Sequence, residues 1–333
     1  MSWHRIDDPP ILNREEIITE LNNGKEVLIQ FSHPRYRLDV LNEINNLCSI
    51  SNNKLHIRFY GHYGTPFDCN ILKHISYVKH LSIDCLDSAV NTSVIADLLH
   101  LEVFSLGIYE LHDAEILRLD NLQNIKKLSL GPTKNKQLNL TYLETYNRLQ
   151  ELAISGHTKQ IATVGKLKQL ESLWLTSISK TPLDFLNGLK QLQSFSLLLG
   201  GRPNLVEVNL DSLEKLKIIR VRGFNYLDNL GNFPALKELT IEDQIQLQSI
   251  DFPDTLQSLS TITLSNCKKL SALPGLKNLS GLKNLSIYQT NIDFDNLIEN
   301  SLPKSLGNFR FYTAKSNLDK VIKEQIKHLG YYS

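Results

Sequence analysis

A short apolar spacing that returns about every 23 residues is the feature that most limits how this chain can fold. In residues 282–287 (Leu-Lys-Asn-Leu-Ser-Ile), apolar side chains stand at the first, fourth and sixth places. The spacing is found twelve times, and successive middle residues are 20 to 24 residues apart. These middle residues are Ile57, Leu81, Phe104, Leu128, Leu152, Leu173, Phe195, Ile219, Leu239, Ile262, Leu285 and Phe309. So narrow a period predicts a stack of similar units, each packed only against its neighbours.

The fourth and sixth places alternate with mostly polar residues, which is typical of a strand with one buried face. One such strand cannot bury its apolar side alone, but stacked strands of equal length form a continuous core. The segments between strands carry their own apolar residues, so we expect short helices or 3₁₀ turns there.

The spacing Leu-x-x-Leu-x-Leu at this period resembles that of the leucine-rich repeat family. The resemblance implies an α/β solenoid, a horseshoe of about 12 repeats of 20–24 residues over residues 54–314, with a parallel β-sheet on its concave side. The family usually has Asn or Cys three residues after the last apolar place, and here only Cys267 fits. The turns are therefore predicted to be less regular than the stack.

The N-terminal segment, residues 1–53, is predicted to be a cap and an irregular first repeat. Asn13 followed by Glu16 indicates the start of a helix. Residues 26–31 alternate as a strand does, and residues 38–48 have apolar side chains at helical spacing.

Residues 315–333 are predicted to form a C-terminal capping helix. Ser316 and Asp319 have the spacing of a capping pair. The apolar stripe of this helix consists of Leu318, Val321, Ile322, Ile326 and Leu329.

Composition excludes several partners and compartments. The formal net charge of +1 argues against a general electrostatic grip on nucleic acid or on an anionic membrane. No apolar run approaches the roughly 18 residues that span a bilayer, and the first ten residues do not resemble a secretory signal. The four cysteines have no paired spacing. We therefore expect a monomer in the cytoplasm, with no membrane or nucleic-acid partner.

If the first, fourth and sixth places are buried, the fifth and seventh places face the concave side. Most of these positions are small and polar, so a few large residues stand out. Exposed Trp, Tyr and Arg are the residue types that carry protein–protein contacts. The predicted partner-binding residues are Trp174, Leu198, Arg220, Arg222, Glu242, Tyr288, Arg310 and Tyr312. The alternative is that they pack against each other, with Arg220 and Arg222 paired to Glu238 and Glu242.

Candidate chemical sites are weak. His56 and His80 occupy the third place of neighbouring repeats and could lie side by side, but their spacing matches no metal-ligand motif. The sequence Cys85-Leu86-Asp87 resembles the C-x-D motif of bacterial ubiquitin ligases that carry leucine-rich repeats, in which the motif lies in a separate helical domain. No other catalytic motif is present. We predict no catalytic residue, no metal and no cofactor.

These observations predict a non-enzymatic module that binds another protein along its concave face. The chain resembles small cytoplasmic bacterial repeat proteins, some of which are immunity or antitoxin proteins and others adaptors. Two alternatives stay open. One is a host-directed effector or ubiquitin-ligase relative, and the other is a carbohydrate or small-ligand receptor that uses Trp174, Tyr288 and Tyr312.

Overall fold

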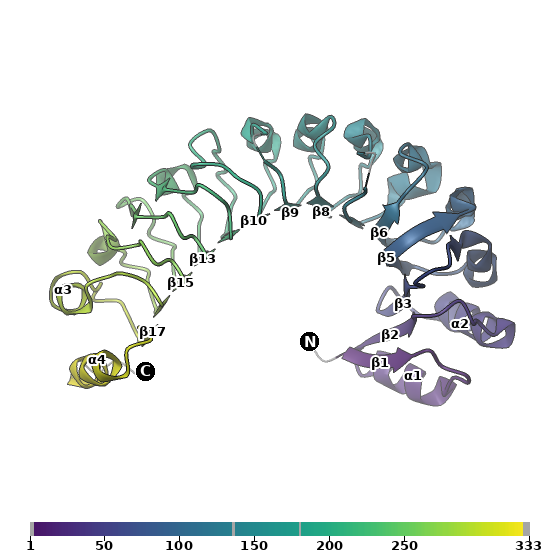
Figure 1. Cartoon of the computed structure of the whole chain (residues 1–333), viewed down its shortest axis with the longest axis horizontal. Helices are drawn as coiled ribbons and strands as arrows, with labels where there is room; N and C mark the ends of the chain where they lie inside the picture. The colour runs from purple at the N-terminus through teal and green to yellow at the C-terminus, as the bar shows by residue number, and fades with distance from the viewer. Residues whose placement is uncertain (1–2, 135–136, 180, 329–333) are drawn as a thin grey trace. The chain divides into compact units, whose positions relative to one another are not determined.

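The computed structural model of the chain describes residues 3–134, 137–179 and 181–328 (Figure 1). It consists of two compact units, Met1–Gln169 (unit 1) and Leu170–Ser333 (unit 2). Within each unit, the strands line one side and short helices lie on the other (Figure 1).

The strands of unit 1 run parallel, each paired with the next along the chain. They are β1 (Trp3–Asp7), β2 (Glu26–Phe31), β3 (Leu55–Gly61), β5 (His80–Val90), β6 (Val103–Glu110), β7 (Lys127–Leu130) and β8 (Glu151–Ser155), with β4 (Phe67–Asp68) paired to β5. The connecting helices are α1 (Arg14–Asn22), α2 (Leu38–Ile50), η1 (Cys69–Ile75), η2 (Thr92–Asp97), η3 (Ile116–Arg118), η4 (Asp120–Asn124), η5 (Leu140–Thr145) and η6 (Ile161–Lys166). All the η elements are 3₁₀ helices, as predicted for this side of the stack.

Unit 2 is more regular, because its seven main strands have five residues each. They are β9 (Ser172–Thr176), β10 (Ser194–Leu198), β11 (Lys215–Ile219), β13 (Glu238–Glu242), β15 (Thr261–Ser265), β16 (Asn284–Tyr288) and β17 (Asn308–Tyr312). Two short strands, β12 (Tyr226–Leu227) and β14 (Ser249–Ile250), form a separate pair. The helices are η7 (Asp184–Gly188), η8 (Leu230–Asn232), η9 (Leu276–Asn278), α3 (Phe294–Asn300) and α4 (Ser316–His328).

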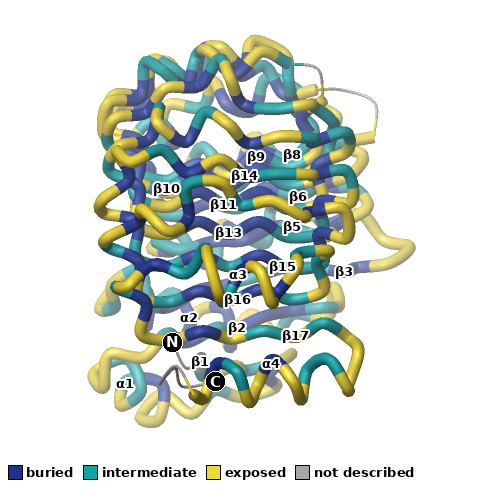
Figure 2. The backbone as a smooth tube through the Cα atoms, turned by 90° about the vertical axis from the view of Figure 1, so that its left-hand side faces the viewer, coloured by how far each residue is buried: buried dark blue, intermediate teal, exposed yellow. Residues whose placement is uncertain are grey.

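The core follows the repeated apolar places. Leu239, Ile262 and Leu285 are fully buried and stand opposite one another on three successive strands. Figure 2 shows such buried segments recurring from strand to strand. Because each row of side chains is covered by the rows of the next strands, the parallel pairing and the apolar packing stabilise the same arrangement.

Three residues after the last apolar place of a repeat, the side chain bonds the backbone of the turn. More residue types do so here than the family pattern predicts. Cys267 is buried there, and its thiol lies 3.4 Å from the carbonyl oxygen of Ser265. In the corresponding positions, the buried His157 and Gln244 bond backbone carbonyls at 2.8 and 2.9 Å. His157 Nδ1 also accepts a hydrogen bond from the Leu138 amide, so the proton is on Nε2. Histidine and glutamine therefore form the side-chain hydrogen bonds to the turn backbone that were expected only of Asn or Cys.

The predicted register is wrong at one repeat. The Cα partners of Leu216 are Phe195 and Leu239, so Leu216 is the middle residue of this repeat. Ile219, which was predicted to occupy that place, lies three residues further along. The steps to the neighbouring repeats become 21 and 23 residues in place of 24 and 20. The apolar places are thus Leu213, Leu216 and Ile218, all of which are buried.

The elements near the N-terminus agree with the sequence pattern, with one omission. The Asn13 side chain accepts a hydrogen bond from the Glu16 amide at the start of α1, as predicted. Strand β2 and helix α2 also lie where the sequence placed them. The strand β1 was missed, because it is a short edge strand without the repeated spacing.

The helix α4 is present, but its predicted cap is wrong. Asp319 accepts hydrogen bonds from the amide and the hydroxyl of Thr313, at 2.9 and 2.7 Å, in place of the expected pairing with Ser316. Ile322 and Ile326 are buried, whereas Val321 is more than half exposed. Leu329, the last member of the predicted stripe, lies outside the described residues.

Candidate functional site

One side of the unit 2 sheet faces away from the apolar core and the short helices, and we call it the strand face. Two rows of side chains form it. Successive members of a row are Cα partners on neighbouring strands. The fifth-place row is Trp174, Ser196, Lys217, Thr240, Thr263, Ser286 and Arg310, and the seventh-place row is Thr176, Leu198, Ile219, Glu242, Ser265, Tyr288 and Tyr312. Six of the eight predicted site residues lie in these rows: Trp174, Leu198, Glu242, Tyr288, Arg310 and Tyr312.

Two aromatic side chains near the ends of the strand face are strongly exposed. Trp174 is 44% exposed, because its neighbours Leu173 and Leu175 fill the core and the alternation of the strand turns it outward. Tyr312 is 50% exposed on β17. Neighbouring strands are about 4.8 Å apart, so the six steps from β9 to β17 span roughly 29 Å. A surface of this width matches one partner of a standard protein–protein interface.

Charges on the strand face are partly paired. Glu242 lies 4.0 Å from Lys217, one strand away. At the starts of β11 and β13, two residues before the fifth place, Lys215 and Glu238 form an ion pair of 2.9 Å. Arg310 is exposed and makes no ion pair with any described residue. Most of the charge on this side is therefore balanced, and Arg310 is a cation available to a partner.

The predicted places of Arg220 and Arg222 are wrong. The fifth and seventh places of their repeat belong to Lys217 and Ile219, and both arginines follow the end of β11. Arg220 has a positive φ of 49° and so belongs to the turn.

This turn is repeated after each main strand of unit 2 from β9 to β16. A residue in the left-handed conformation follows the strand, and its amide donates to a carbonyl on the next strand. For Arg220 the acceptor is the Glu242 carbonyl oxygen at 3.0 Å. The six residues are Ser177, Leu199, Arg220, Asp243, Asn266 and Gln289. Sequence reasoning missed this row, although Asp243 and Asn266 are of a type that tolerates positive φ.

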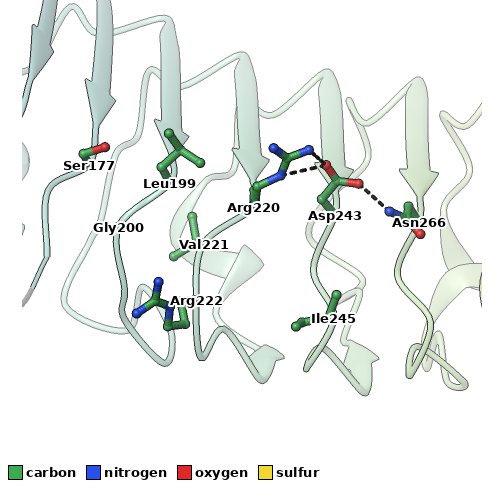
Figure 3. Close-up of a pocket in the computed structure, with 9 residues that line it drawn as sticks. All are labelled: Ser177, Leu199, Gly200, Arg220, Val221, Arg222, Asp243, Ile245 and Asn266. Atoms are coloured by element: carbon green, nitrogen blue, oxygen red, sulfur yellow. Dashed lines mark hydrogen bonds and ion pairs between the residues drawn. The ribbon is translucent and has the colours of Figure 1, made fainter.

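A pocket of about 540 Å³ lies along this row (Figure 3). It is lined by Ser177, Leu199, Gly200, Arg220, Val221, Arg222, Asp243, Ile245 and Asn266. All nine belong to unit 2, and none lies in the two rows of the strand face. The pocket therefore lies beside the strand face, where the strands end.

One polar network crosses the pocket. Arg220 donates to a single carboxylate oxygen of Asp243 from Nη2 at 2.7 Å and from Nε at 3.2 Å, as Figure 3 shows. The other oxygen of Asp243 accepts from Asn266 Nδ2 at 2.6 Å. The hydrogen bond from Asn266, followed by that from Arg220, lowers the pKa of Asp243, which stays ionised at neutral pH.

In unit 1, the histidine pair is confirmed as neighbours. The rings of His56 and His80 are stacked with centroids 3.7 Å apart, and His56 Nε2 lies 2.8 Å from the Ser82 hydroxyl. Burial lowers the pKa of His56 to about 2 and that of His80 to about 4. Among the described residues, no group of three or more His, Cys, Asp or Glu side chains could hold a metal ion.

Cys85 is the exposed one of the four free cysteines. Its thiol lies 3.8 Å from the guanidinium of Arg58, which is itself paired with Asp84 at 2.7 Å. Cys85 has a positive φ of 52°, at the position where the pairing of β5 shifts. This geometry accounts for the Cys85-Leu86-Asp87 segment as an irregular strand.

No helix in the described part of the chain is both long and apolar enough to cross a membrane.

No protein-family model matches the chain. A probable disease resistance protein of Arabidopsis thaliana is 32% identical over 160 residues, which are 44% of this chain and 13% of the plant protein. The chain thus spans only a small part of the length of this relative.

Solved structures give a wider match. The structure of the Toll–Spatzle complex of Drosophila is similar with a TM-score of 0.53 and 15% identity, over 93% of this chain and 50% of that chain. An internalin of Listeria monocytogenes is similar with a TM-score of 0.49 and 20% identity, over 77% of this chain and 80% of that chain. At such identities the similarity concerns the fold alone. Together with the repeated spacing and the parallel strands in register, the similarity to the Toll structure shows that the chain has a leucine-rich repeat fold.

Proposed function

We propose that this chain is a non-enzymatic module that binds another protein along the strand face of unit 2. The observation that carries the proposal is the exposure of Trp174 and Tyr312 on one continuous sheet, with Tyr288 beside Tyr312 on the neighbouring strand. Large, rigid aromatic side chains bury much area at little cost in conformational entropy, which is why they dominate binding energy at interfaces.

The rest of the strand face suits a protein partner. Between the aromatic residues stand small polar side chains such as Thr240, Thr263 and Ser286, which leave room for an approaching surface. Arg310 adds a planar donor, unpaired among the residues that the structure describes, next to Tyr288 and Tyr312. Among the similar structures, Toll is seen in complex with Spatzle.

Within this proposal, the chain works as a cytoplasmic monomer that masks or recruits its partner, as an immunity protein or an adaptor does. The near-neutral net charge of +1 supports a protein partner over nucleic acid or an anionic membrane.

The test has two steps. The tagged full chain captures its partner from an extract of the source organism, and the identified partner is then purified and titrated against variants. We expect Trp174→Ala and Tyr312→Ala each to weaken binding about tenfold or more. The matched control is Tyr226→Ala, because Tyr226 is 48% exposed but lies in β12, outside the main sheet. Wild-type affinity in both strand-face variants would contradict the proposal.

A carbohydrate ligand is the second candidate, favoured by the neighbouring positions of Tyr288 and Tyr312. Paired aromatic faces can stack on sugar rings. Binding of the pure chain to a glycan array, lost in Tyr288→Ala and Tyr312→Ala, would support this candidate over a protein partner.

A further inference from the structure

The pocket beside the strand face has an excess of positive charge. Of its three charged residues, Arg220 and Asp243 pair with each other, and Asn266 takes the second oxygen of Asp243. Arg222 is exposed and makes no side-chain hydrogen bond or ion pair with any residue in the described ranges. The Arg220 side chain is itself 69% exposed, so its guanidinium is also accessible. The pocket therefore carries one uncompensated positive charge.

Apolar side chains surround this charge. Leu199 is 39% exposed and Ile245 is 57% exposed, and both line the pocket. Val221, between the two arginines in sequence, is buried and lies between Arg220 and Arg222 in Figure 3. A ligand whose negatively charged group bound Arg222 would thus also cover exposed apolar area, and burial of that area would strengthen binding.

The backbone around Arg222 is held in place. The Arg222 amide donates to the Gly200 carbonyl at 3.1 Å, and the Arg222 carbonyl accepts from the Arg202 amide at 3.0 Å. Gly200 has a φ of 75°, and a Cβ there would meet the Ile178 carbonyl oxygen at 2.8 Å, so glycine is required. The fold therefore sets the backbone position of Arg222 before any ligand binds, so that only its side chain has to be ordered on binding.

We propose that this pocket is a subsite for one acidic side chain, an aspartate or a glutamate, next to an apolar side chain in an extended segment of the protein partner. Arg222 binds the carboxylate, and Leu199 and Ile245 contact the apolar neighbour. The inference rests on the proposed protein-binding function and assigns part of the partner's chemistry.

A monoanion suits the pocket better than a phosphate. The net charge of the three ionised residues is one positive, which a single carboxylate balances. A dianion would exceed the one uncompensated positive charge of the pocket, which already holds the carboxylate of Asp243. The guanidinium of Arg222 can bind a carboxylate through two parallel hydrogen bonds.

The experiment uses a phage-displayed library of random eight-residue peptides, selected on the full chain and separately on the variant Arg222→Gln. We expect the wild-type chain to enrich peptides in which Asp or Glu lies within two residues of a large apolar residue. We expect the variant not to enrich them. The best peptide is then synthesised in three forms, with its acidic residue, with the matching amide, and with phosphoserine at that place.

Titrations of these peptides give the quantitative test. The acidic peptide should bind Arg222→Gln about tenfold more weakly than it binds the wild type, since charge-assisted hydrogen bonds contribute this much. The amide peptide should bind both proteins equally weakly. Lys190→Gln is the matched control, because Lys190 is exposed, follows η7 on the helix side of unit 2 and does not line the pocket, so its loss should leave the affinity unchanged.

The other outcomes overturn the proposal. They are no enrichment of any peptide, enrichment without acidic residues, tighter binding of the phosphoserine form, or equal losses in Arg222→Gln and Lys190→Gln. Peptides that lose affinity for Trp174→Ala but not for Arg222→Gln would leave the strand-face proposal intact and exclude this subsite.

Discussion

Arg58 in unit 1 and Arg310 in unit 2 occupy the same fifth place of their repeats, but their surroundings differ. Arg58 bonds Asp84 at 2.7 Å and Gln30 at 3.3 Å, and lies over the ring of Tyr60. Arg310 is exposed and has no such partner among the described residues.

The same contrast holds for the rings of the two units. In unit 1, His56 and His80 stack on each other and are largely shielded from water. In unit 2, Trp174 and Tyr312 are about half exposed. The outward residues of unit 1 stabilise their own unit, and a partner would have to break these contacts to bind there. Those of unit 2 have contact area to offer, so we propose that one repeated fold carries a structural face in unit 1 and a binding face in unit 2.

The largest expected effect is acid destabilisation of unit 1. Both buried imidazoles have pKa values below the ordinary 6.5, at about 2 for His56 and about 4 for His80. The unfolded chain therefore binds more protons than the folded chain once the pH falls below about 6.5. Full stability is present above that pH and is lost progressively towards pH 4. At pH 5 the loss is about 2 kcal/mol for each ring.

Hydrogen exchange at pH 7.5 and pH 5, corrected for intrinsic rates, checks this prediction by region. Protection should fall in β3 and β5 and persist in β13 and β15. A double variant, His56→Gln with His80→Gln, should flatten the pH dependence of unfolding by urea. The nearby cations Arg58 and Lys127 also lower the pKa values of His56 and His80, respectively. Equal loss of protection in both units would contradict the assignment of the acid effect to the histidine pair.

The next effect comes from one matched substitution in each unit. Arg58→Gln should lower the free energy of unfolding by about 1–2 kcal/mol, because it leaves the half-buried Asp84 without its charge-assisted partner. Arg310→Gln should change it by less than about 0.5 kcal/mol, as is usual for an exposed residue without contacts. Urea denaturation measures both.

The affinities of these two variants for the partner should reverse that order. Arg310→Gln should weaken binding several-fold, and Arg58→Gln should leave it unchanged in the folded protein. If Arg58→Gln had the larger effect on affinity, the division between a structural face and a binding face would be wrong.

The smallest perturbation tests the register of β11. Ile219 and Glu242 are Cα partners, and neighbouring strands are about 4.8 Å apart, within the range that a disulfide spans. The variant Ile219→Cys with Glu242→Cys should therefore form a disulfide in air. Arg222→Cys with Glu242→Cys, the pair that the sequence pattern aligned, should not, because Arg222 lies beyond the end of β11, past the left-handed turn at Arg220. Gel mobility with and without reductant distinguishes the two results.

The repeated spacing was sufficient to predict one main strand in each repeat, because the same burial requirement acts at each unit of the stack, but it missed the short strands β1, β4, β12 and β14. Residues 213–221 show where this reasoning stops. Leu213, Leu216 and Ile218 have the required spacing, and so do Leu216, Ile219 and Val221. Only pairing with β10 and β13 decides between the two sets, and that pairing is a contact between residues far apart in sequence.

The pocket was not predictable for a related reason. It is built from a left-handed turn at Arg220 and from the approach of the next repeat at Asp243, neither of which an apolar pattern encodes. The two arginines were singled out by residue type, and the structure moves them from the strand face to the pocket beside it.

The most direct test of the binding face compares a photo-crosslinking residue at one position in each unit. p-Benzoylphenylalanine is placed at Thr263, in the middle of the strand face, or at Ser105, at the fifth place of β6 in unit 1. After irradiation in cells of the source organism, the Thr263 position should give an adduct with another protein, and the Ser105 position should give none. An adduct from Ser105 alone, or from neither position, would contradict the account.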